Sequence, residues 1–290
     1  MKFAPFDYAA PTSVAEAVAL LAQAGGKAKA LAGGQSLLPT MAFRMATPTL
    51  LVDLCKIPGL DKIAIDDNGV RLGARVRWRD IEEDTRLKTA HPLLVAAVQH
   101  VAHYQIRNRG TVGGSCAHAD PAAEMPGIAV TCDAEFVFQG PKGVRVVKAG
   151  KFFLGPLSTA LADDELIIEV RLPAWPARRR WAFEEFSQRR GDFALAGVAV
   201  FYDEDAAARA TNSHIGVIGA CHRPQRVPQA EAALNGRAVD AAAVAAAAEA
   251  LSGALDPPED LHAGAAYRRA LAGTLVERAL KRAARAATGT

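Results

Sequence analysis

The sequence predicts a mixed α+β protein, and three observations support this fold class. A strand, a helix and a second strand open the chain. Two prolines in four residues, Pro173 and Pro176, then interrupt the pattern, because proline suits neither a helix interior nor a central strand. Behind them, strand-like runs are followed by alanine-rich helices. This order is typical of a small antiparallel sheet packed against helices.

The opening unit has clear limits. A short extended piece is expected from Lys2 to Phe6, followed by an amphipathic helix within Pro11 to Gly25. Ser13 and Glu16 have the spacing of a capping box at the start of this helix. The apolar run Ala28 to Ala32 then forms the second strand.

The middle of the chain mixes strand and helix patterns. We expect a strand at 50–54, a hairpin of 63–65 with 70–72, helices at 79–86 and 92–103, a short helix from 121, a hairpin of 135–138 with 144–147, and a strand at 165–171. In the last third of the chain, the sequence predicts strands at 181–186, 195–202 and 214–218, and helices beginning near 230, 241 and 267.

Composition excludes several classes of protein. The net charge of +3 and the isoelectric point near 8.7 are too mild to indicate a nucleic-acid partner, since the basic residues are spread along the chain. Neither a secretory signal nor a membrane span is evident, so a cytoplasmic protein is expected. The four cysteines lack the C-x-x-C spacing of zinc or iron–sulfur sites, so we expect no metal site in this chain.

A diglycine segment, Ala32-Gly33-Gly34-Gln35-Ser36, follows the second predicted strand. Glycine lets backbone amides approach a ligand closely, and consecutive amides can bind a pyrophosphate. Ser36 is expected to cap the helical turn that follows. Diglycine turns after strands are common, so this segment alone favours a structural interpretation.

A second segment, Thr111-Val112-Gly113-Gly114-Ser115, repeats the pattern and strengthens the ligand hypothesis. Two such loops fit a ligand with two phosphates. The second loop leads into Asp120-Pro121, which predicts a helix start with Glu124 in the first turn. Glu124 can stabilise the helix through its dipole, or accept hydrogen bonds from the ribose of a nucleotide; both interpretations stay open.

A Rossmann site is the main alternative for these glycines. Asp53 lies at about the distance at which such a site places its ribose-binding acid. However, the loop lacks the G-x-G-x-x-G pattern, follows the second strand of the unit, and meets Pro39 where a long helix is required.

The two loops together resemble one family of flavoproteins, which includes the medium subunit of aerobic carbon monoxide dehydrogenase and the FAD domain of xanthine dehydrogenase. The resemblance covers nearly the whole chain. Its motifs are Lys2 to Tyr8, Ala32 to Leu38, Ile106 to Pro126, Asp164 to Pro173, and Gly191 to Ala194. Several separate motifs in order are more specific than any one of them.

The resemblance implies an FAD-binding fold of the vanillyl-alcohol-oxidase (PCMH-like) type. Its two α/β subdomains would span 1–55 and 56–176, followed by a C-terminal domain of antiparallel strands and helices over 177–290. The implied FAD contacts are Ala32, Gly33, Gly34, Gln35, Ser36, Thr111, Val112, Gly113, Gly114, Ser115, Glu124, Leu166, Ile167, Asp192 and Phe193. Apolar residues in predicted strands are more often core, which applies to Leu166, Ile167 and Phe193.

Three positions depart from the family pattern. Ser115 replaces a frequent asparagine, Glu124 replaces a frequent aspartate, and Glu185 replaces a frequent lysine. Glu185 reverses a charge, and no role is assigned to it. The histidines form no ligand cluster by spacing, and only His118, on the second loop, is a candidate for a contact with the flavin.

The resemblance implies an electron-transfer subunit of a molybdenum hydroxylase. A large partner would carry the molybdenum cofactor, a small partner two 2Fe-2S clusters, and FAD on this chain would pass electrons to an external acceptor, in a dimer of heterotrimers. No catalytic side chain is assigned to this chain. One alternative is a stand-alone FAD-dependent oxidase or reductase of the same fold, and another is a nucleotide-binding regulatory module without redox turnover.

Overall fold

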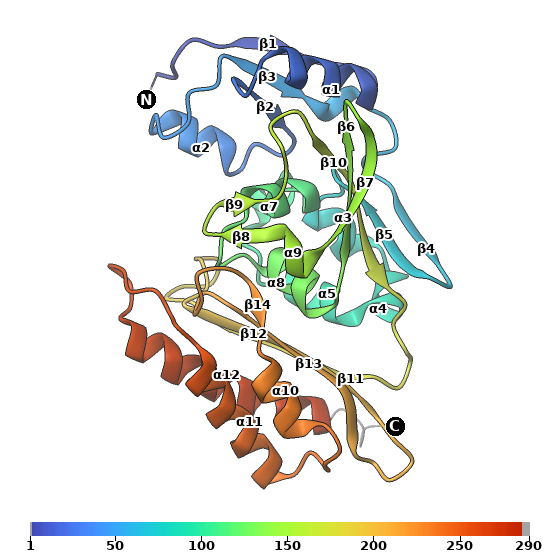
Figure 1. Cartoon of the computed structure of the whole chain (residues 1–290), viewed down its shortest axis with the longest axis vertical. Helices are drawn as coiled ribbons and strands as arrows, with labels where there is room; N and C mark the ends of the chain where they lie inside the picture. The colour runs from blue at the N-terminus through green and yellow to red at the C-terminus, as the bar shows by residue number, and fades with distance from the viewer. Residues whose placement is uncertain (1, 286–290) are drawn as a thin grey trace.

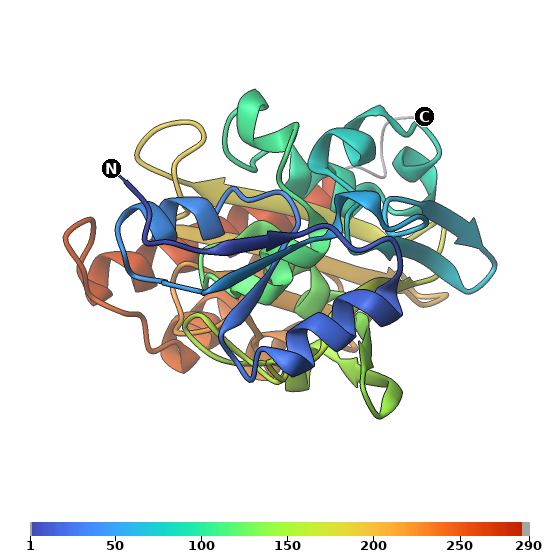
Figure 2. The same cartoon turned by 90° about the horizontal axis from the view of Figure 1, so that it is seen from above.

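A computed structural model describes residues 2–285. Three larger sheets follow one another along the long axis of the molecule (Figure 1), together with a two-stranded sheet. The first sheet is parallel, with the strand order β1 (Asp7–Ala9), β3 (Leu50–Asp53), β2 (Ala28–Leu31). Viewed from above, this sheet and helix α1 (Val14–Gln23) lie in front of the rest of the molecule (Figure 2).

The first helix begins as its sequence predicts. The Oγ of Ser13 accepts a hydrogen bond from the amide of Glu16 at 3.2 Å. The Glu16 carboxylate reaches back to the amide of Thr12, at 2.8 Å, instead of that of Ser13. The first strand begins at Asp7, beyond the extended piece expected at Lys2 to Phe6, because its pairing with β3 starts there.

The second sheet is antiparallel and forms the centre of the molecule. Its order is β4 (Ile63–Asp66), β5 (Gly69–Gly73), β10 (Leu166–Pro173), β6 (Glu135–Gly140), β7 (Gly143–Lys148). The connections contain α3 (Trp78–Glu83), α4 (Leu87–Ala90), α5 (Pro92–Val98), α6 (Tyr104–Arg107), α7 (Val112–His118), α8 (Glu124–Thr131), α9 (Ala149–Phe152), and the pair β8 (Phe153–Gly155) and β9 (Ser158–Thr159). Both predicted hairpins are confirmed.

The third sheet confirms the predicted change of architecture. It is antiparallel, in the order β11 (Arg180–Phe186), β12 (Ala196–Glu204), β13 (Ala210–Ile218), β14 (Gln225–Arg226). Helices α10 (Pro228–Leu234), α11 (Ala241–Ala254) and α12 (Ala265–Arg285) cover one face (Figure 1). The other face packs on the central region, since Phe183, Phe201 and Ile218 belong to the same core as the second sheet.

Three local predictions need correction. The helix expected over 92–103 ends at Val98. The helix expected from Pro121 begins at Glu124 instead, because the Asp120 side chain accepts a hydrogen bond from the amide of Ala122 and holds a turn before it. The second diglycine lies inside the first turn of α7, and not on a loop leaving a strand.

Each of the three larger sheets lies within one of the predicted segments 1–55, 56–176 and 177–290. The boundaries of these domains stay a prediction. Within residues 2–285, no helix is both long and apolar enough to cross a membrane.

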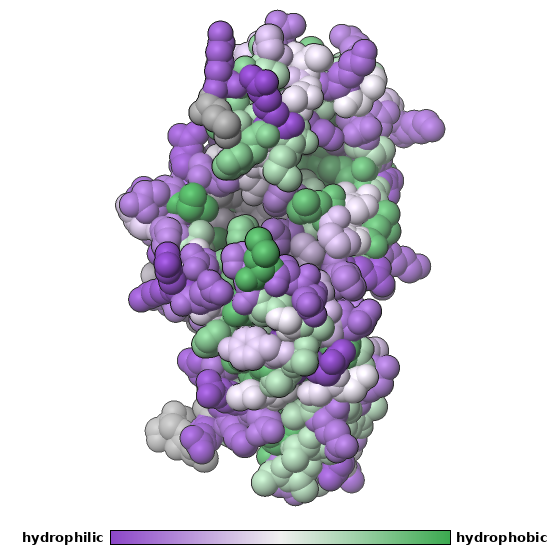
Figure 3. Space-filling view, turned by 90° about the vertical axis from the view of Figure 1, so that its left-hand side faces the viewer, coloured by the Kyte–Doolittle hydropathy of each residue, from purple (hydrophilic) through white to green (hydrophobic). Residues whose placement is uncertain are grey.

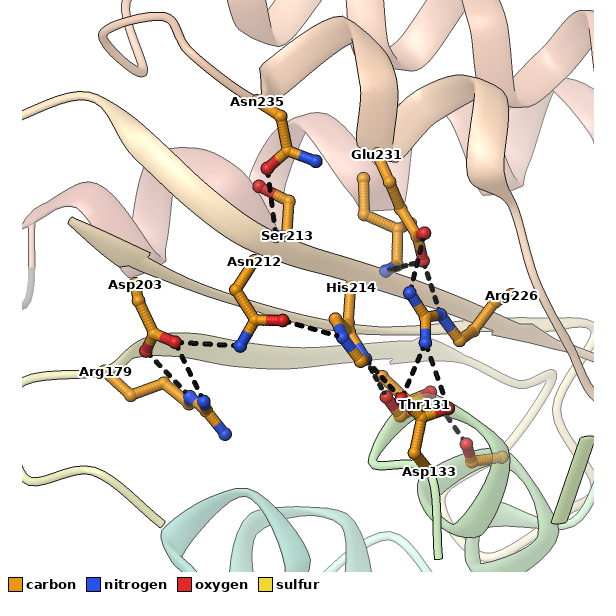
Figure 4. A network of polar contacts seen from close by, with 12 residues as sticks. Thr131, Asp133, Arg179, Asp203, Asn212, Ser213, His214, Arg226, Glu231 and Asn235 are labelled. Atoms are coloured by element: carbon orange, nitrogen blue, oxygen red, sulfur yellow. Dashed lines mark hydrogen bonds and ion pairs between the residues drawn. The ribbon is translucent and has the colours of Figure 1, made fainter. Parts of the chain in front are cut away.

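A polar network joins the end of α8 to the third sheet (Figure 4). The backbone carbonyl of Thr131 accepts a hydrogen bond from Nδ1 of His214 at 2.6 Å. Arg226 bridges Asp133, at 2.9 Å, and Glu231, at 2.8 Å. The network therefore connects the central region to both β13 and α10.

Candidate cofactor-binding site

The first diglycine segment leaves β2 and makes a turn with unpaired backbone donors. Within residues 2–285, the amides of Gly33, Gly34, Gln35 and Ser36 donate to no protein acceptor. Gly34 has φ +73°, a conformation that favours glycine. Consecutive free amides of this kind form a concave site for an anion.

Ser36 does not cap the following helix, contrary to expectation. Its side chain makes no capping hydrogen bond, and its backbone is already in the helical region. The helix that follows, α2 (Leu37–Ala42), has only six residues and contains Pro39. The long helix of a Rossmann site is therefore missing at this position.

The second diglycine segment has a different role from the first. Thr111 is the N-cap of α7, and its Oγ1 accepts a hydrogen bond from the amide of Gly114 at 3.1 Å. The amides of Val112 and Gly113 donate to the carbonyls of Val76 and Ala74, and that of Ser115 to Thr111. These amides are thus already used by the protein, whereas the Ser115 hydroxyl makes no hydrogen bond among residues 2–285 and stays available as a donor.

The fold brings the two segments into contact through glycine. A Cβ on Gly33 would overlap the backbone carbonyl of Arg109, which lies two residues before the second segment. A Cβ on Gly114 would lie 3.9 Å from the Cβ of Ala32. Any larger residue at Gly33 would therefore push the two segments apart.

The surface of the molecule is hollowed near these elements. Figure 3 shows the side on which α2 and β9 lie in Figure 1, and the upper half of this face contains a recess. Unpaired amides next to glycines without Cβ atoms suit a dinucleotide, whose pyrophosphate needs close backbone approach. The residues present therefore fit FAD.

Glu124 is the first residue of α8 and is only partly buried. Burial raises the pKa of its carboxyl to about 7, and the neighbouring Asp120 raises it further. Within residues 2–285, its side chain has no cation within ion-pair distance. A carboxyl without a cation among residues 2–285 can accept hydrogen bonds from hydroxyl groups of a ligand, so both interpretations of Glu124 stay compatible with its place.

Leu166 and Ile167 lie at the start of β10 and are buried, with 4% and 3% of their surface exposed. Leu166 packs in the core of the first sheet, and Ile167 in that of the central region. Packing in these two cores is therefore enough to explain why both residues are apolar. A contact of either one with FAD stays a prediction.

Asp192 and Phe193 lie on the loop between β11 and β12, away from the diglycine segments in sequence. They line a cavity of about 700 Å³ together with Asp120 and Arg268. Phe193 is 67% exposed, and several other aromatic residues, such as Phe43, are exposed to a similar degree. The place of Asp192 and Phe193 beside the flavin stays a prediction.

Arg268 was missed by the sequence analysis. It is 4% exposed, and its guanidinium donates to the carbonyls of Leu195 and Gly219 and to Asp260. It therefore shapes the loop that carries Phe193. Arg268 lies on the buried face of α12, at helical spacing from Ala272 and Leu275. This spacing of a charged residue among apolar ones is visible in the sequence and could have identified it.

In the part of the chain that the structure describes, the histidines join no group of three potential metal ligands. Among residues 2–285, no three His, Cys, Asp or Glu side chains come together as metal ligands would. His118 lies in the last turn of α7 and makes no hydrogen bond within the described part of the chain. Its contact with the flavin stays a prediction.

Comparison with known protein families identifies both halves of the chain. Residues 4–175 match the family described as the FAD binding domain in molybdopterin dehydrogenase. Residues 181–283 match the CO dehydrogenase flavoprotein C-terminal domain. The chain belongs to the FAD-binding medium subunits of the molybdenum hydroxylase family.

Individual medium subunits are similar over almost their full length. The medium chain of carbon monoxide dehydrogenase from Hydrogenophaga pseudoflava is 41% identical over 280 residues, covering 96% of each chain. The medium subunit of nicotine 6-hydroxylase from Paenarthrobacter nicotinovorans is 39% identical over 280 residues, covering 97% of this chain and 98% of the relative.

Solved structures of such enzymes have the same fold. A carbon monoxide dehydrogenase from Hydrogenophaga pseudoflava has a TM-score of 0.95 at 41% identity, with 98% of each chain covered. Quinoline 2-oxidoreductase from Pseudomonas putida 86 has a TM-score of 0.94 at 36% identity, with 100% of each chain covered. This agreement confirms the predicted fold class for a medium subunit of the family.

Proposed function

We propose that this medium subunit holds FAD between its two diglycine segments and transfers electrons in a heterotrimeric molybdenum hydroxylase. The observation that carries the proposal is the run of unpaired amides from Gly33 to Ser36. The contact of this run with the second segment, through Gly33 and Arg109, supports it. The family membership supplies the identity of the cofactor.

The chain's own residues would bind and orient the cofactor. The amides of Gly33 to Ser36 would donate to the pyrophosphate, Ser115 would add a hydroxyl donor, and Glu124 would accept from hydroxyls of the nucleotide half. Asp192 and Phe193 would cover the flavin and limit access of water. When bound, FAD supplies the redox chemistry, accepting one or two electrons at a time.

The source and the acceptor of the electrons lie outside this chain. We place two 2Fe-2S clusters on a small partner and the molybdenum cofactor on a large one, in a dimer of heterotrimers. The relatives named above are medium chains or medium subunits, which supports a complex with other subunits. A cytoplasmic location and the external acceptor stay predictions.

Reconstitution tests the proposal directly. The isolated chain should bind FAD in a one-to-one complex and quench its fluorescence. Co-expression with candidate small and large subunits should give a complex in which substrate reduces the flavin. Omission of the small subunit should abolish that reduction while FAD stays bound, because the electrons would have no route to it.

Other outcomes would contradict the proposal. A chain that binds no FAD, alone or in the complex, would remove its basis. Flavin reduction by a small organic substrate in the isolated chain would instead favour a stand-alone oxidase or reductase. A bound flavin that no reductant reduces and no acceptor reoxidises would favour a nucleotide-binding module without redox turnover.

A further inference from the structure

Glu185 is a buried carboxylate without a strong partner. Its side chain is 3% exposed, and its Oε2 is buried and accepts no hydrogen bond within residues 2–285. Its Oε1 lies 3.9 Å from Nδ1 of His100, beyond hydrogen-bond distance. An ionised carboxylate is costly in such surroundings, so the group needs a proton or an opposite charge.

The sheet register points Glu185 toward the FAD-binding part of the chain. Glu185 pairs with Gly197 on β12, and its Cγ lies over this glycine beside Ile218. Ile218 in turn packs against Gly127 of α8, whose first residue is Glu124. The neighbouring Glu184 points to the opposite face, where it pairs with Arg282 of α12.

The charged groups that face Glu185 cannot neutralise it. On α8, Glu124 lies one turn before Gly127 and its charge repels that of Glu185, and Asp120 lies before that helix. From the segment after α5, His100 approaches Glu185, and the pKa of His100 is lowered by burial and by Arg190 and Arg282, with Glu184 acting in the opposite direction. His100 is therefore neutral at neutral pH, and it does not neutralise Glu185.

We propose that the carboxyls of Glu124 and Glu185 together keep one proton, and that this proton sets the charge which the site presents to FAD. The inference rests on the proposed place of the cofactor at Glu124. With the proton, the pair carries a single negative charge. Without it, two carboxylates would face a ligand whose pyrophosphate is itself anionic, and the ligand would bind more weakly.

The titration of the pair is consistent with this role. Burial raises the pKa of Glu185 to about 9, and repulsion from Glu124 contributes. The pKa of Glu124 is raised to about 7, mainly by burial. The two groups interact, so the two pKa values belong to the pair as a whole. The last proton of the pair is lost at alkaline pH.

The first experiment measures the dissociation constant of FAD between about pH 7.5 and about pH 9.5. For the wild-type chain we expect the constant to rise roughly fourfold as the pair loses its proton. Glu185→Gln and Glu185→Met, the second of similar volume and apolar, should abolish this rise. Glu184→Gln is the matched control on the opposite face and should retain it.

The second experiment observes the proton itself, by infrared spectroscopy of the protein without FAD. A protonated carboxyl band should disappear between about pH 8 and about pH 10 in the wild type and be missing in Glu185→Gln. Glu124→Gln should lower the pH at which the band disappears, because it removes the repelling charge.

Two results would overturn the inference. One is the lack of a titrating carboxyl band that depends on Glu185. The other is an equal pH dependence of FAD binding in the wild type and both Glu185 variants. Failure of every protein to bind FAD would contradict the proposed function instead, and the infrared band would then still decide whether the pair holds a proton.

Discussion

Gly33 lies against the backbone carbonyl of Arg109, so closely that a single added methyl group would overlap it. This contact joins two parts of the chain that are far apart in the sequence, the first diglycine segment after β2 and Arg109, two residues before the second segment. It holds the free amides of the first segment beside the hydroxyl groups of the second. The geometry of the proposed FAD site therefore depends on the absence of a side chain at Gly33.

Gly33→Ala should separate the two segments. We expect the free energy of unfolding to fall by about 1–3 kcal/mol, since the neighbouring backbone cannot move freely, and FAD affinity to fall at least tenfold. Gly253→Ala is the control, because nothing lies within 4 Å of that position in α11. It should be neutral or stabilising by about 0.5–1 kcal/mol. FAD binding by Gly33→Ala at wild-type affinity would contradict this account.

Thr111→Val should weaken the start of α7. The substitution removes the Oγ1 that accepts from the amide of Gly114, at a cost of about 1 kcal/mol in urea unfolding. It also leaves that amide unpaired beside the site, so FAD affinity should change. Thr111→Ser keeps the acceptor and should retain most of the stability. Full stability of Thr111→Val together with a loss in Thr111→Ser would show that the methyl group, and not the cap, matters.

His91 should make the protein less stable in acid. It is fully buried, and burial lowers its pKa from the ordinary 6.5 to about 3. As the pH falls below about 6.5, the unfolded chain takes up a proton that the folded chain refuses until about pH 3. The free energy of unfolding should therefore decrease by up to about 1.4 kcal/mol per pH unit in this window.

His91→Asn isolates this contribution. The Nδ1 of His91 caps α5 by accepting from the amide of Leu94, and asparagine can supply an equivalent acceptor without titrating. Urea unfolding of the variant between about pH 6.5 and about pH 4 should show a shallower loss of stability than the wild type. Identical slopes would assign the acid sensitivity to other groups.

Arg226→Gln should loosen the connection between α8 and the third sheet. It removes the bridge from Asp133 to Glu231 and leaves Glu231, whose side chain is 8% exposed, without its cation. Since Asp133 is largely exposed, we expect a loss of about 1–3 kcal/mol, less than for a fully buried pair. Arg209→Gln, which removes an exposed pair with Asp205, should cost less than about 0.5 kcal/mol. Similar effects of both changes would argue against a connecting role for Arg226.

Local sequence patterns predicted much of the secondary structure. The turn at Asp66 to Gly69 and the cap at Ser13 follow from side chains that bond to their own backbone, so neighbours in the sequence suffice. The predicted start of α8 is too early, also because a side chain bonds to nearby backbone. Asp120 bonds to the amide of Ala122 in a turn, which resembles an N-cap in sequence.

The sequence by itself identified the two diglycine segments, because their glycines and hydroxyl residues are contiguous. Only the tertiary structure decided that the amides of the first segment stay free while those of the second donate to Val76 and Ala74. It also decided that Glu185 is buried, with its Oε2 unpaired among residues 2–285, instead of exposed to solvent. Free donors and buried charges depend on which distant residues the sheets bring together, and that information is spread over the whole chain.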